Sequence, residues 1–335
     1  MNKDRHADPF LNMTMFQSRA WLKIKGGSAW QANLSGSVEV DFFGTTNGLE
    51  NIVRLRHAFI KLAWPKTSLL VGQYWSPFFT VDVFPQCVNF NTGVPFQPFA
   101  RFPQISIYHS VTQSIRIHSV LSIQRDAFQE IGGKDIQQRS GLPAIHLHSI
   151  YEKGPVLFGI GWMQKTLRPL FDNIQAEAMT VYGKWDMNRF TFRAKVISGN
   201  DLADHIMLGG CVNIKNTVTG LITCNPTQLM SYWFDVDYTI RNYSIGIFGG
   251  YSSNLGIDRP LTPIEQFSFS ARSPDIQNVR RVSPRFTVKS GAVKFAFEYD
   301  LTIAKYAAEW NAYLIPMNSS PVQNHRFLLA MYLVF

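Results

Sequence analysis

Apolar and polar residues alternate along many short stretches of the chain. Between Val293 and Ile303, apolar side chains occupy every second position, and Glu298 and Asp300 lie among the positions between them. A period of two is typical of β-strands that have one apolar and one polar face. This alternation predicts fifteen strands, at 14–25, 30–43, 52–64, 67–78, 104–111, 113–125, 144–152, 155–166, 174–186, 189–199, 227–240, 243–254, 279–289, 293–305 and 323–335.

The lengths of these strands and of their connections indicate the kind of sheet. Most of the strands have about 9–14 residues, which is long for a soluble β-sandwich but suits strands that cross a membrane at a tilt. Short turns alternate with longer connections, among them 79–103, 126–143, 200–226, 255–278 and 306–322. Short turns at one end and long loops at the other are typical of outer-membrane barrels. The sequence therefore predicts an all-β fold, a transmembrane antiparallel β-barrel over 14–335 that follows an N-terminal remnant at 1–13.

The number of predicted strands is odd, whereas bacterial single-chain barrels have an even number. The first and last predicted strands run in the same direction, so one further strand is needed between them. The opening MNKDRHADPF also has charges but lacks the apolar segment of a secretory signal peptide. We therefore expect sixteen strands in the complete protein, with a signal peptide and a first strand before Met1. The alternative is that residues 1–13 form an irregular first strand.

Composition agrees with this fold and argues against other classes. Charged residues make up 16% of the chain, compared with roughly 25% in an ordinary soluble domain, and aromatic residues make up 14%. No run of 18 or more apolar residues is present, as a membrane-spanning helix would require. The net charge is +9, but the basic residues are spread singly along the strands, so we do not expect nucleic-acid binding.

The last ten residues, RFLLAMYLVF, have a wholly apolar face. Phe327, Leu329, Met331, Leu333 and Phe335 share this face, and such a face suits a strand that touches lipid. Pairing with the first strand would hold an end of the chain that otherwise frays. We interpret this segment as the closing strand of the barrel, and the terminal Phe resembles the assembly signal of outer-membrane barrels.

Six segments carry a resemblance to a known family: VEVDFFG (38–44), LRHAFIKLAW (55–64), LLVGQYWSPF (69–78), FNTGVPFQPFARFPQI (90–105), residues 206–210 and GGYSSNLG (249–256). They resemble the porin-like outer-membrane barrels of Bacteroidetes-type bacteria, over most of the chain. The resemblance implies a sixteen-stranded porin of the bacterial outer membrane, in contact with lipid and lipopolysaccharide, and a homotrimer. Small hydrophilic solutes would diffuse through it passively, without a cofactor.

The polar faces of the strands would line the lumen, and their charges would set selectivity. Because basic residues outnumber acidic ones in the whole chain, 32 to 23, we expect a mild preference for anions. Arg54 and Arg56 are the sharpest candidates, since the next strand presents Gln73 and Trp75 rather than acids. The alternative is that these charges pair across strands and stiffen the wall. The pore-lining candidates are Arg54, Arg56, Glu39, Asp41, Arg116, Arg193, Lys195, Asp235, Asp237, Lys294, Glu298 and Asp300.

The connection at 79–103 is rich in aromatic residues and follows Pro77. Further prolines, at Pro85, Pro95 and Pro98, fix backbone angles and prevent the segment from becoming another strand. We expect this loop to fold inward and narrow the pore, with Asp82 and Arg101 at the constriction. The alternative is an extracellular loop that packs on its neighbours.

Three cysteines and a few histidines are the remaining candidates for chemistry. Cys211 and Cys224 bracket twelve residues of one long loop, where an oxidising exterior would permit a disulfide. His146 and His148 share a strand face, but no third ligand lies at a suitable spacing, so we do not expect a metal site. His57 shares a predicted face with Leu55, and it would face lipid, a subunit interface or a bulge.

An enzyme is the main alternative to a channel. A lipase or protease in a barrel needs a nucleophile beside a base. The chain has no G-x-S-x-G motif, and no histidine of a clean outward face lies beside a serine at the same predicted depth. We therefore expect no enzymatic activity, and we keep a barrel enzyme or a sealed structural barrel as the alternatives.

Overall fold

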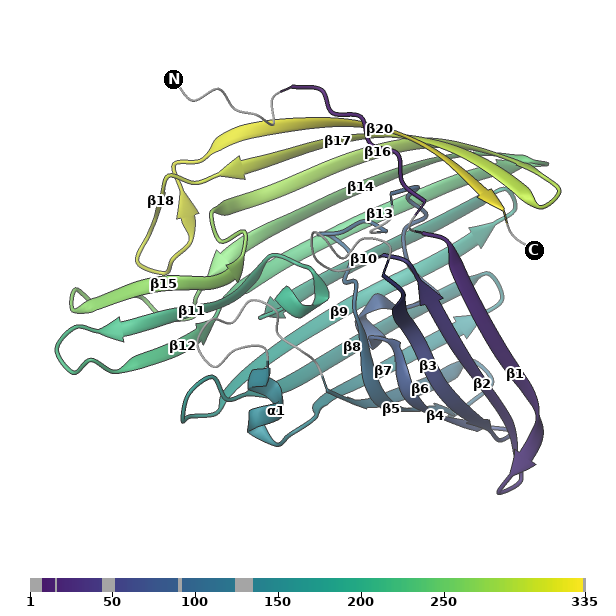
Figure 1. Ribbon diagram of the computed structural model, residues 1–335, viewed down its shortest axis with the longest axis horizontal. Helices are drawn as coiled ribbons and strands as arrows, with labels where there is room; N and C mark the ends of the chain where they lie inside the picture. Colours follow the sequence, from purple (N-terminus) through teal and green to yellow (C-terminus); the bar gives the residue numbers. More distant parts are fainter. Residues whose placement is uncertain (1–7, 16, 44–51, 90–91, 124–134, 334–335) are drawn as a thin grey trace.

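The computed structural model of the chain describes residues 8–15, 17–43, 52–89, 92–123 and 135–333 (Figure 1). Fifteen strands form one antiparallel sheet in which each strand pairs with the next one of the set. These are β1 (Arg19–Ala29), β2 (Ala32–Asp41), β3 (Arg54–Ala63), β4 (Thr67–Trp75), β5 (Arg101–Ser110), β6 (Ile115–Ser122), β7 (Ala144–Lys153), β8 (Val156–Leu167), β9 (Ile174–Met187), β10 (Phe190–Asn200), β13 (Gln228–Ile240), β14 (Tyr243–Gly256), β16 (Ile276–Ser290), β17 (Val293–Tyr306) and β20 (Ser320–Leu333).

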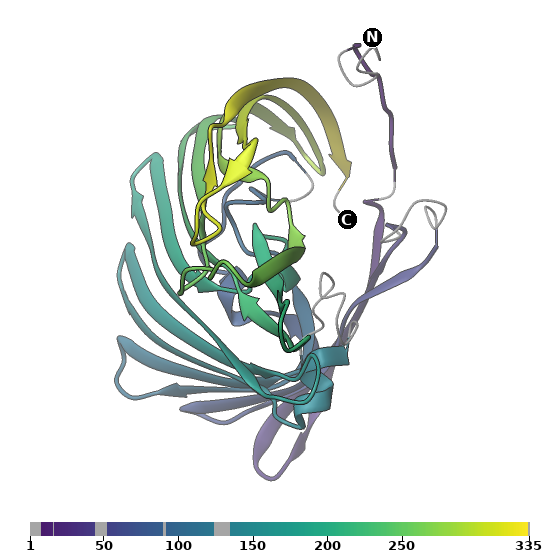
Figure 2. The same ribbon diagram turned by 90° about the vertical axis from the view of Figure 1, so that its left-hand side faces the viewer.

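The sheet curls around a central space that is occupied by other segments of the chain (Figure 2). Each of the fifteen strands coincides with a predicted one, so the all-β prediction and the antiparallel order are confirmed. Strands β1 and β20 are the two edges of the sheet and are not paired with each other. Short turns join the strands at one end and longer connections join them at the other. None of the described helices is long and apolar enough to cross a membrane.

The longer connections contain structure that the alternation did not predict. Strands β11 (Gly209–Asn216), β12 (Ile222–Pro226) and β15 (Glu265–Arg272) form a separate three-stranded sheet, on the left of Figure 1. Next to it lie the two-residue strands β18 (Glu309–Trp310) and β19 (Pro316–Met317). A small apolar core of their own stabilises these extensions. Short helices complete the fold: η1 (Pro77–Phe79), α1 (Ile136–Ser140) and η3 (Ala203–His205).

Two local features differ from the prediction. The first strand was predicted to end at residue 25, but β1 continues through Gly26 and Gly27 with an irregular register. The chain then turns at Trp30 and Gln31, both with positive φ. A two-residue turn with positive φ at both positions matches the twist of a hairpin. Strand β3 contains a bulge opposite β2. Glu39 of β2 pairs with His57, but the next residue, Val40, pairs with Leu55, so Arg56 is the extra residue. The bulge turns His57 inward, and it is buried.

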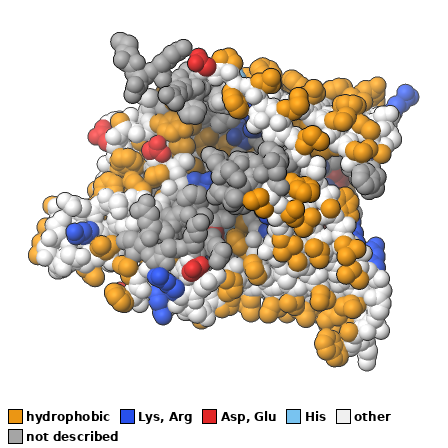
Figure 3. All heavy atoms as spheres, in the orientation of Figure 1, with side chains coloured by type: hydrophobic (Ala, Val, Ile, Leu, Met, Phe, Trp, Pro, Cys, Tyr) orange, Lys and Arg blue, Asp and Glu red, His pale blue; other side chains and the backbone are white. Residues whose placement is uncertain are grey.

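The outer face of the sheet is apolar and open to its surroundings. On β20, Leu329 is 82% exposed, and Phe297 beside it on β17 is 43% exposed. Hydrophobic side chains cover much of the surface seen in Figure 3, with charged ones scattered among them. The apolar face predicted for the last strand is therefore confirmed for its described residues. The largest buried cluster lies inside the barrel, where Val83 and Phe96 of the connection between β4 and β5 pack against Trp233 and Phe248 of the wall.

Candidate functional site: the barrel interior

The described residues of the connection between β4 and β5, 76–89 and 92–100, run through the interior and are called the inner loop below. At its start, the Lys195 ammonium of β10 donates hydrogen bonds to the carbonyl oxygens of Phe78 and Phe79, at 2.8 and 3.2 Å. Farther along, the backbone N–H groups of Val88 and Asn89 donate to the carboxylate of Glu298 on β17, at 2.8 and 2.9 Å. The loop thus reaches from one side of the wall to the other.

Other wall residues hold the second half of the inner loop. Ser231 donates to the carbonyl oxygen of Phe96 at 3.1 Å, and the indole N–H of Trp233 donates to Gln97 at 3.0 Å. Gln97 in turn donates to the Phe79 carbonyl oxygen at 2.6 Å, which ties the two halves of the loop together. Two predicted pore-lining residues, Lys195 and Glu298, are therefore used as supports for the loop.

The arginines of β3 pair with acids on β2. Arg54 makes a bidentate pair with Asp41, at 2.8 and 3.0 Å. Arg56 reaches both Glu39, at 2.7 Å, and Asp41, at 2.8 Å. Strand β4 presents Gln73 and Trp75, and the acids that pair with both arginines lie on the other neighbouring strand, β2. These four residues form one network on the inner face.

A second network joins β10, β13 and β16. The Arg193 guanidinium lies 3.0 Å from Asp235 and 2.8 Å from Asp237. Arg285 pairs with the same two carboxylates, at 2.7 and 2.6 Å. The side chain of Asp235 is fully buried. Two guanidinium groups and two carboxylates therefore balance one another inside the wall.

The last three predicted pore-lining residues also have neighbours. Asp300 accepts hydrogen bonds from Ser283 and from Arg326, and the ion pair with Arg326 measures 2.7 Å. Arg116 lies 2.5 Å from Glu152 near a short turn. The Lys294 ammonium lies over the ring of Tyr332, 4.4 Å from its centre. Most of the inner charges are thus paired across strands, which is the alternative that the sequence left open.

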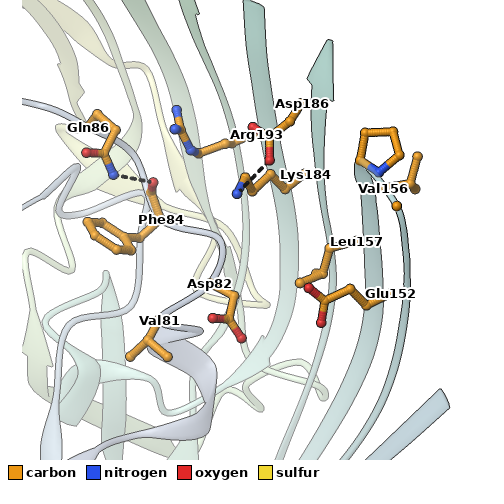
Figure 4. Close-up of a pocket in the computed structure, with 12 residues that line it drawn as sticks. Val81, Asp82, Phe84, Gln86, Glu152, Val156, Leu157, Lys184, Asp186 and Arg193 are labelled. Carbon is orange, nitrogen blue, oxygen red and sulfur yellow. Dashed lines mark hydrogen bonds and ion pairs between the residues drawn. The ribbon is translucent and has the colours of Figure 1, made fainter. Parts of the chain in front are cut away.

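A cavity of about 320 Å³ separates the inner loop from the wall (Figure 4). Val81, Asp82, Phe84 and Gln86 line it from the loop, and turn and strand residues from β7 to β10 line the opposite side. Asp82 makes no ion pair with any described residue, and its carboxylate points into the space in front of Leu157. The wall side carries further charged groups: Glu152, Lys184, Asp186 and Arg193.

Arg101, the second residue expected at the constriction, lies elsewhere. Its guanidinium stacks 4.7 Å from the centre of the Trp75 ring and 5.4 Å from that of Phe99. One of its nitrogens is buried and has no hydrogen-bond partner among the described residues. Arg101 does not line the cavity beside Asp82. The structure therefore does not bring the two candidates together into one site.

The cysteines lie outside the sheet of fifteen strands. Cys211 of β11 and Cys224 of β12 form a disulfide, with their Cα atoms 5.9 Å apart, and the bond joins the two strands of a hairpin. Cys87 of the inner loop is a free thiol. The described part of the chain contains no group of three or more His, Cys, Asp or Glu residues placed to hold a metal ion.

Comparison with known proteins extends this description. No family model matches the sequence, and no curated protein matches it. Solved structures do match. The outer membrane channel DcaP of Acinetobacter baumannii is 15% identical, with a TM-score of 0.70 over 94% of this chain and 84% of that one. The chain has the fold of the outer-membrane porins.

Two further structures share the porin fold. The anion-selective porin from Comamonas acidovorans is 10% identical, with a TM-score of 0.56 over 94% of this chain and 87% of that one. The trimer form of OmpT, an outer membrane protein of Vibrio cholerae, is 9% identical, with a TM-score of 0.55 over 94% and 90%. At these identities the likeness concerns the fold.

Within this porin fold, the structure reveals contacts that the sequence did not indicate. Ser76 lies 2.8 Å from Nε2 of His205, and Nδ1 of His205 lies 2.8 Å from Asp204. Two further serine–histidine contacts lie on the inner wall, at Ser106–His118 and Ser122–His146. The expectation concerned histidines of an outward face, whereas these serine–histidine contacts lie in the interior. The partners are far apart in the sequence, so no local motif announces them.

The Ser76–His205–Asp204 set has the distances of a hydrolase triad, but it lies in a closed environment. Ser76 is 1% exposed and His205 is fully buried. Burial tends to raise the pKa of Asp204, but Lys165, 3.1 Å away, and His205 lower it to about 2. The backbone oxygen of His205 also accepts a hydrogen bond from the N–H of Phe99. These groups fix both ends of the inner loop to η3.

Proposed function

We propose that the protein is a porin of the bacterial outer membrane, through which small hydrophilic solutes diffuse passively. The observation that carries this proposal is the inner loop, which the wall supports from several strands inside a barrel with an apolar outer face. A loop held in this way narrows a passage without filling it, and it leaves the cavity beside Asp82. The charges around the passage then select among solutes by sign.

We further propose a closed barrel of sixteen strands, of the type found in Bacteroidetes. The two edges of the sheet support this proposal. All neighbouring strands are antiparallel and the sheet has fifteen of them, so β1 and β20 run in the same direction. One additional strand that is antiparallel to both would satisfy the backbone groups of both edges. Such groups must be paired inside lipid, because no water is available to them there.

A homotrimer is the assembly that we propose for this porin. The trimer form of the Vibrio cholerae protein supports this proposal through a shared fold. Contact of the outer face with lipid and lipopolysaccharide belongs to the same proposal. It agrees with the apolar residues on that face, such as Phe297 and Leu329.

We retain the mild preference for anions and assign it to one part of the wall. Arg19, Arg54, Arg56 and Arg101 act on one another electrostatically. The two acids of this group, Glu39 and Asp41, leave an excess of positive charge. Clustered positive charge in a narrow space raises the local concentration of anions. The anion-selective porin from Comamonas acidovorans shows that the shared fold can carry such a preference.

An enzymatic role is not supported by the Ser76–His205–Asp204 set. A nucleophile must reach its substrate, and Ser76, the first residue of the inner loop, is buried. We therefore propose no enzymatic activity. A sealed structural barrel makes a different prediction, since it would pass no current.

The test is a measurement of single-channel conductance and reversal potential in a planar lipid bilayer under a salt gradient. The native protein, extracted from its membrane, should give stepwise currents and a reversal potential displaced toward that of the anion. Insertion without current would refute the porin and favour a sealed barrel. Stepwise currents with a cation-leaning potential would leave the porin in place and overturn the anion preference.

A further inference from the structure

Two basic residues interrupt the otherwise uncharged outer face of the last strands. On β16, the outward series is Arg280, Val282, Pro284 and Phe286, and all four residues are exposed. On β17, Lys305 continues the outward series that contains Phe295 and Phe297. Within β13, β14, β16, β17 and β20, all of which are described, no Asp or Glu lies on this outward face.

Arg280 and Lys305 are diagonal neighbours on adjacent strands. Arg280 pairs in register with Ile303, and Lys305 lies two residues farther along β17. Diagonal neighbours of this kind lie about 7–8 Å apart, within reach of long side chains. Neither residue makes an ion pair with any described residue, whereas the adjacent Arg281 points inward and donates to Thr302 and to the carbonyl oxygen of Val94. The two outward cations are therefore available to a partner outside the wall.

The position of these cations along the strands indicates where the apolar layer ends. From Val293 to Ile303 the outward residues of β17 are uncharged, over about 34 Å of strand. At a tilt of about 40° this corresponds to roughly 26 Å along the membrane normal, close to the apolar band of about 25 Å in such barrels. Lys305 lies directly beyond it, at the end of the strand that leads to the long connections. The cations thus lie at the level of the lipid headgroups on that side.

The neighbours of Arg280 are also of the types found at the level of the lipid headgroups. Tyr251 pairs in register with Arg280, and its ring stacks on Tyr232 at 5.2 Å between centres. Tyrosine is enriched where apolar lipid meets the headgroups. On the other side, Gln323 of β20 faces Ile303 and is exposed, so it supplies a hydrogen-bond donor. Together these residues combine two cations, a polar donor and an aromatic border.

We propose that Arg280 and Lys305 form a binding surface for the phosphate groups of lipopolysaccharide in the outer leaflet. This inference rests on the proposed location in the outer membrane. Arginine and lysine bind phosphate through charge-assisted hydrogen bonds. Lipopolysaccharide presents phosphates at the level where the apolar band ends on the long-loop side. A charge there stays solvated by headgroups, whereas two residues lower it would face hydrocarbon.

The experiment compares binding of lipopolysaccharide by the native protein in detergent with binding by the variant Arg280→Gln/Lys305→Gln. The matched control is Arg189→Gln/Lys289→Gln, which removes two positive charges near the short turns. We expect the affinity to fall roughly tenfold in the first variant, since each cation near an anionic surface contributes to attachment. The control should stay within about twofold of the native protein. Equal affinity of the first variant and the native protein would overturn the proposal.

A second measurement does not depend on any variant. Lipopolysaccharide from which the lipid A phosphates have been removed should bind the native protein roughly tenfold more weakly as well. Undiminished binding would show that phosphate is not the ligand. Channel currents recorded on the same preparations separate the two proposals. If the protein passes current but the substitutions leave lipopolysaccharide binding unchanged, only the lipopolysaccharide site is refuted. If binding depends on phosphate but the protein passes no current, only the channel is refuted.

Discussion

The outer and inner faces of the same strands are stabilised in different ways. On β17, Phe295 and Phe297 of the outer face lie beside other apolar residues and need no specific partner. On the inner face of the same strand, Glu298 and Asp300 are buried, and each is bound to groups from other parts of the chain. Any apolar residue can occupy a position on the outer face. The stability of the inner face depends on specific pairs of residues on neighbouring strands.

This difference shows what alternation can and cannot specify. The period of two assigns each residue to a face. Adjacent residues therefore point in opposite directions: Arg280 is exposed on the outer face, and Arg281 binds the inner loop. The identity of the partners depends on register and on the inner loop. Substitutions on the two faces should consequently have different costs, and four experiments would test this.

The largest effect is expected from Asp235→Ala on the inner face. This substitution removes a fully buried carboxylate between Arg193 and Arg285. Removing one partner of a buried ion pair leaves an uncompensated charge and costs about 3–5 kcal/mol. The free energy of unfolding in lipid vesicles, measured with denaturant, would show the loss. Asp237→Ala is the control, because the side chain of Asp237 is partly exposed and should cost less. If both variants lost the same small amount of unfolding free energy, the network would not stabilise the wall.

On the outer face, Phe297→Arg should lower the free energy of unfolding by about 2–4 kcal/mol if its position is near the bilayer centre. Thr287→Arg is the matched inner substitution. Thr287 lies on the adjacent strand, half-buried and facing the lumen. It should cost much less, since the new charge reaches water. Similar losses in the same vesicle assay would overturn the assignment of the two faces.

Glu298→Gln tests the support of the inner loop. The carboxylate accepts hydrogen bonds from two backbone N–H groups, and hydrogen bonds to charged groups contribute about 1.5–3 kcal/mol. Because a neutral amide oxygen binds more weakly, we expect a less firmly held loop and increased noise in single-channel recordings. Glu309→Gln, in the exposed strand β18, is the control and should leave the recordings unchanged. A quiet channel in Glu298→Gln would show that the loop does not depend on this residue.

The smallest effect is expected from Arg101→Gln. Removing this charge from the basic part of the wall should move the reversal potential toward that of the cation without loss of folding. Arg101→Lys keeps the charge and should keep the potential. A shift in both variants would point to the stacking on Trp75 and Phe99 rather than to charge.

The sheet could be predicted because its information is local. Each of the fifteen strands repeats its own alternation, and the apolar last strand is recognisable from a few residues. The small sheet of β11, β12 and β15 was not predicted, because these strands are short and lie within the longer connections. The double glycine at Gly26 and Gly27 suggested a turn, whereas the chain uses it for an irregularity within β1.

The interior was predictable only in part. Prolines indicated an unusual connection, and the structure places the inner loop inside the barrel. The alternation assigned Arg54 and Arg56 to the lumenal face, but it did not identify Asp41 and Glu39 of the preceding strand as their partners. Ser76 and His205 are 129 residues apart, so only the folded sheet brings them together. Asp82 lies within the inner loop and Arg101 directly follows it, but the two residues do not line the same cavity.

The supports of the inner loop have a consequence for the order of assembly. The bond between Val88 and Glu298 joins residues separated by 210 positions, and Tyr332 reaches the Val88 carbonyl oxygen across 244 positions. Contacts between such distant positions form slowly, because the chain between them must first be organised. The loop can therefore settle only after the C-terminal strands have joined the sheet. Until then the inner loop lacks these supports, and the interior is the last part of the molecule to become ordered.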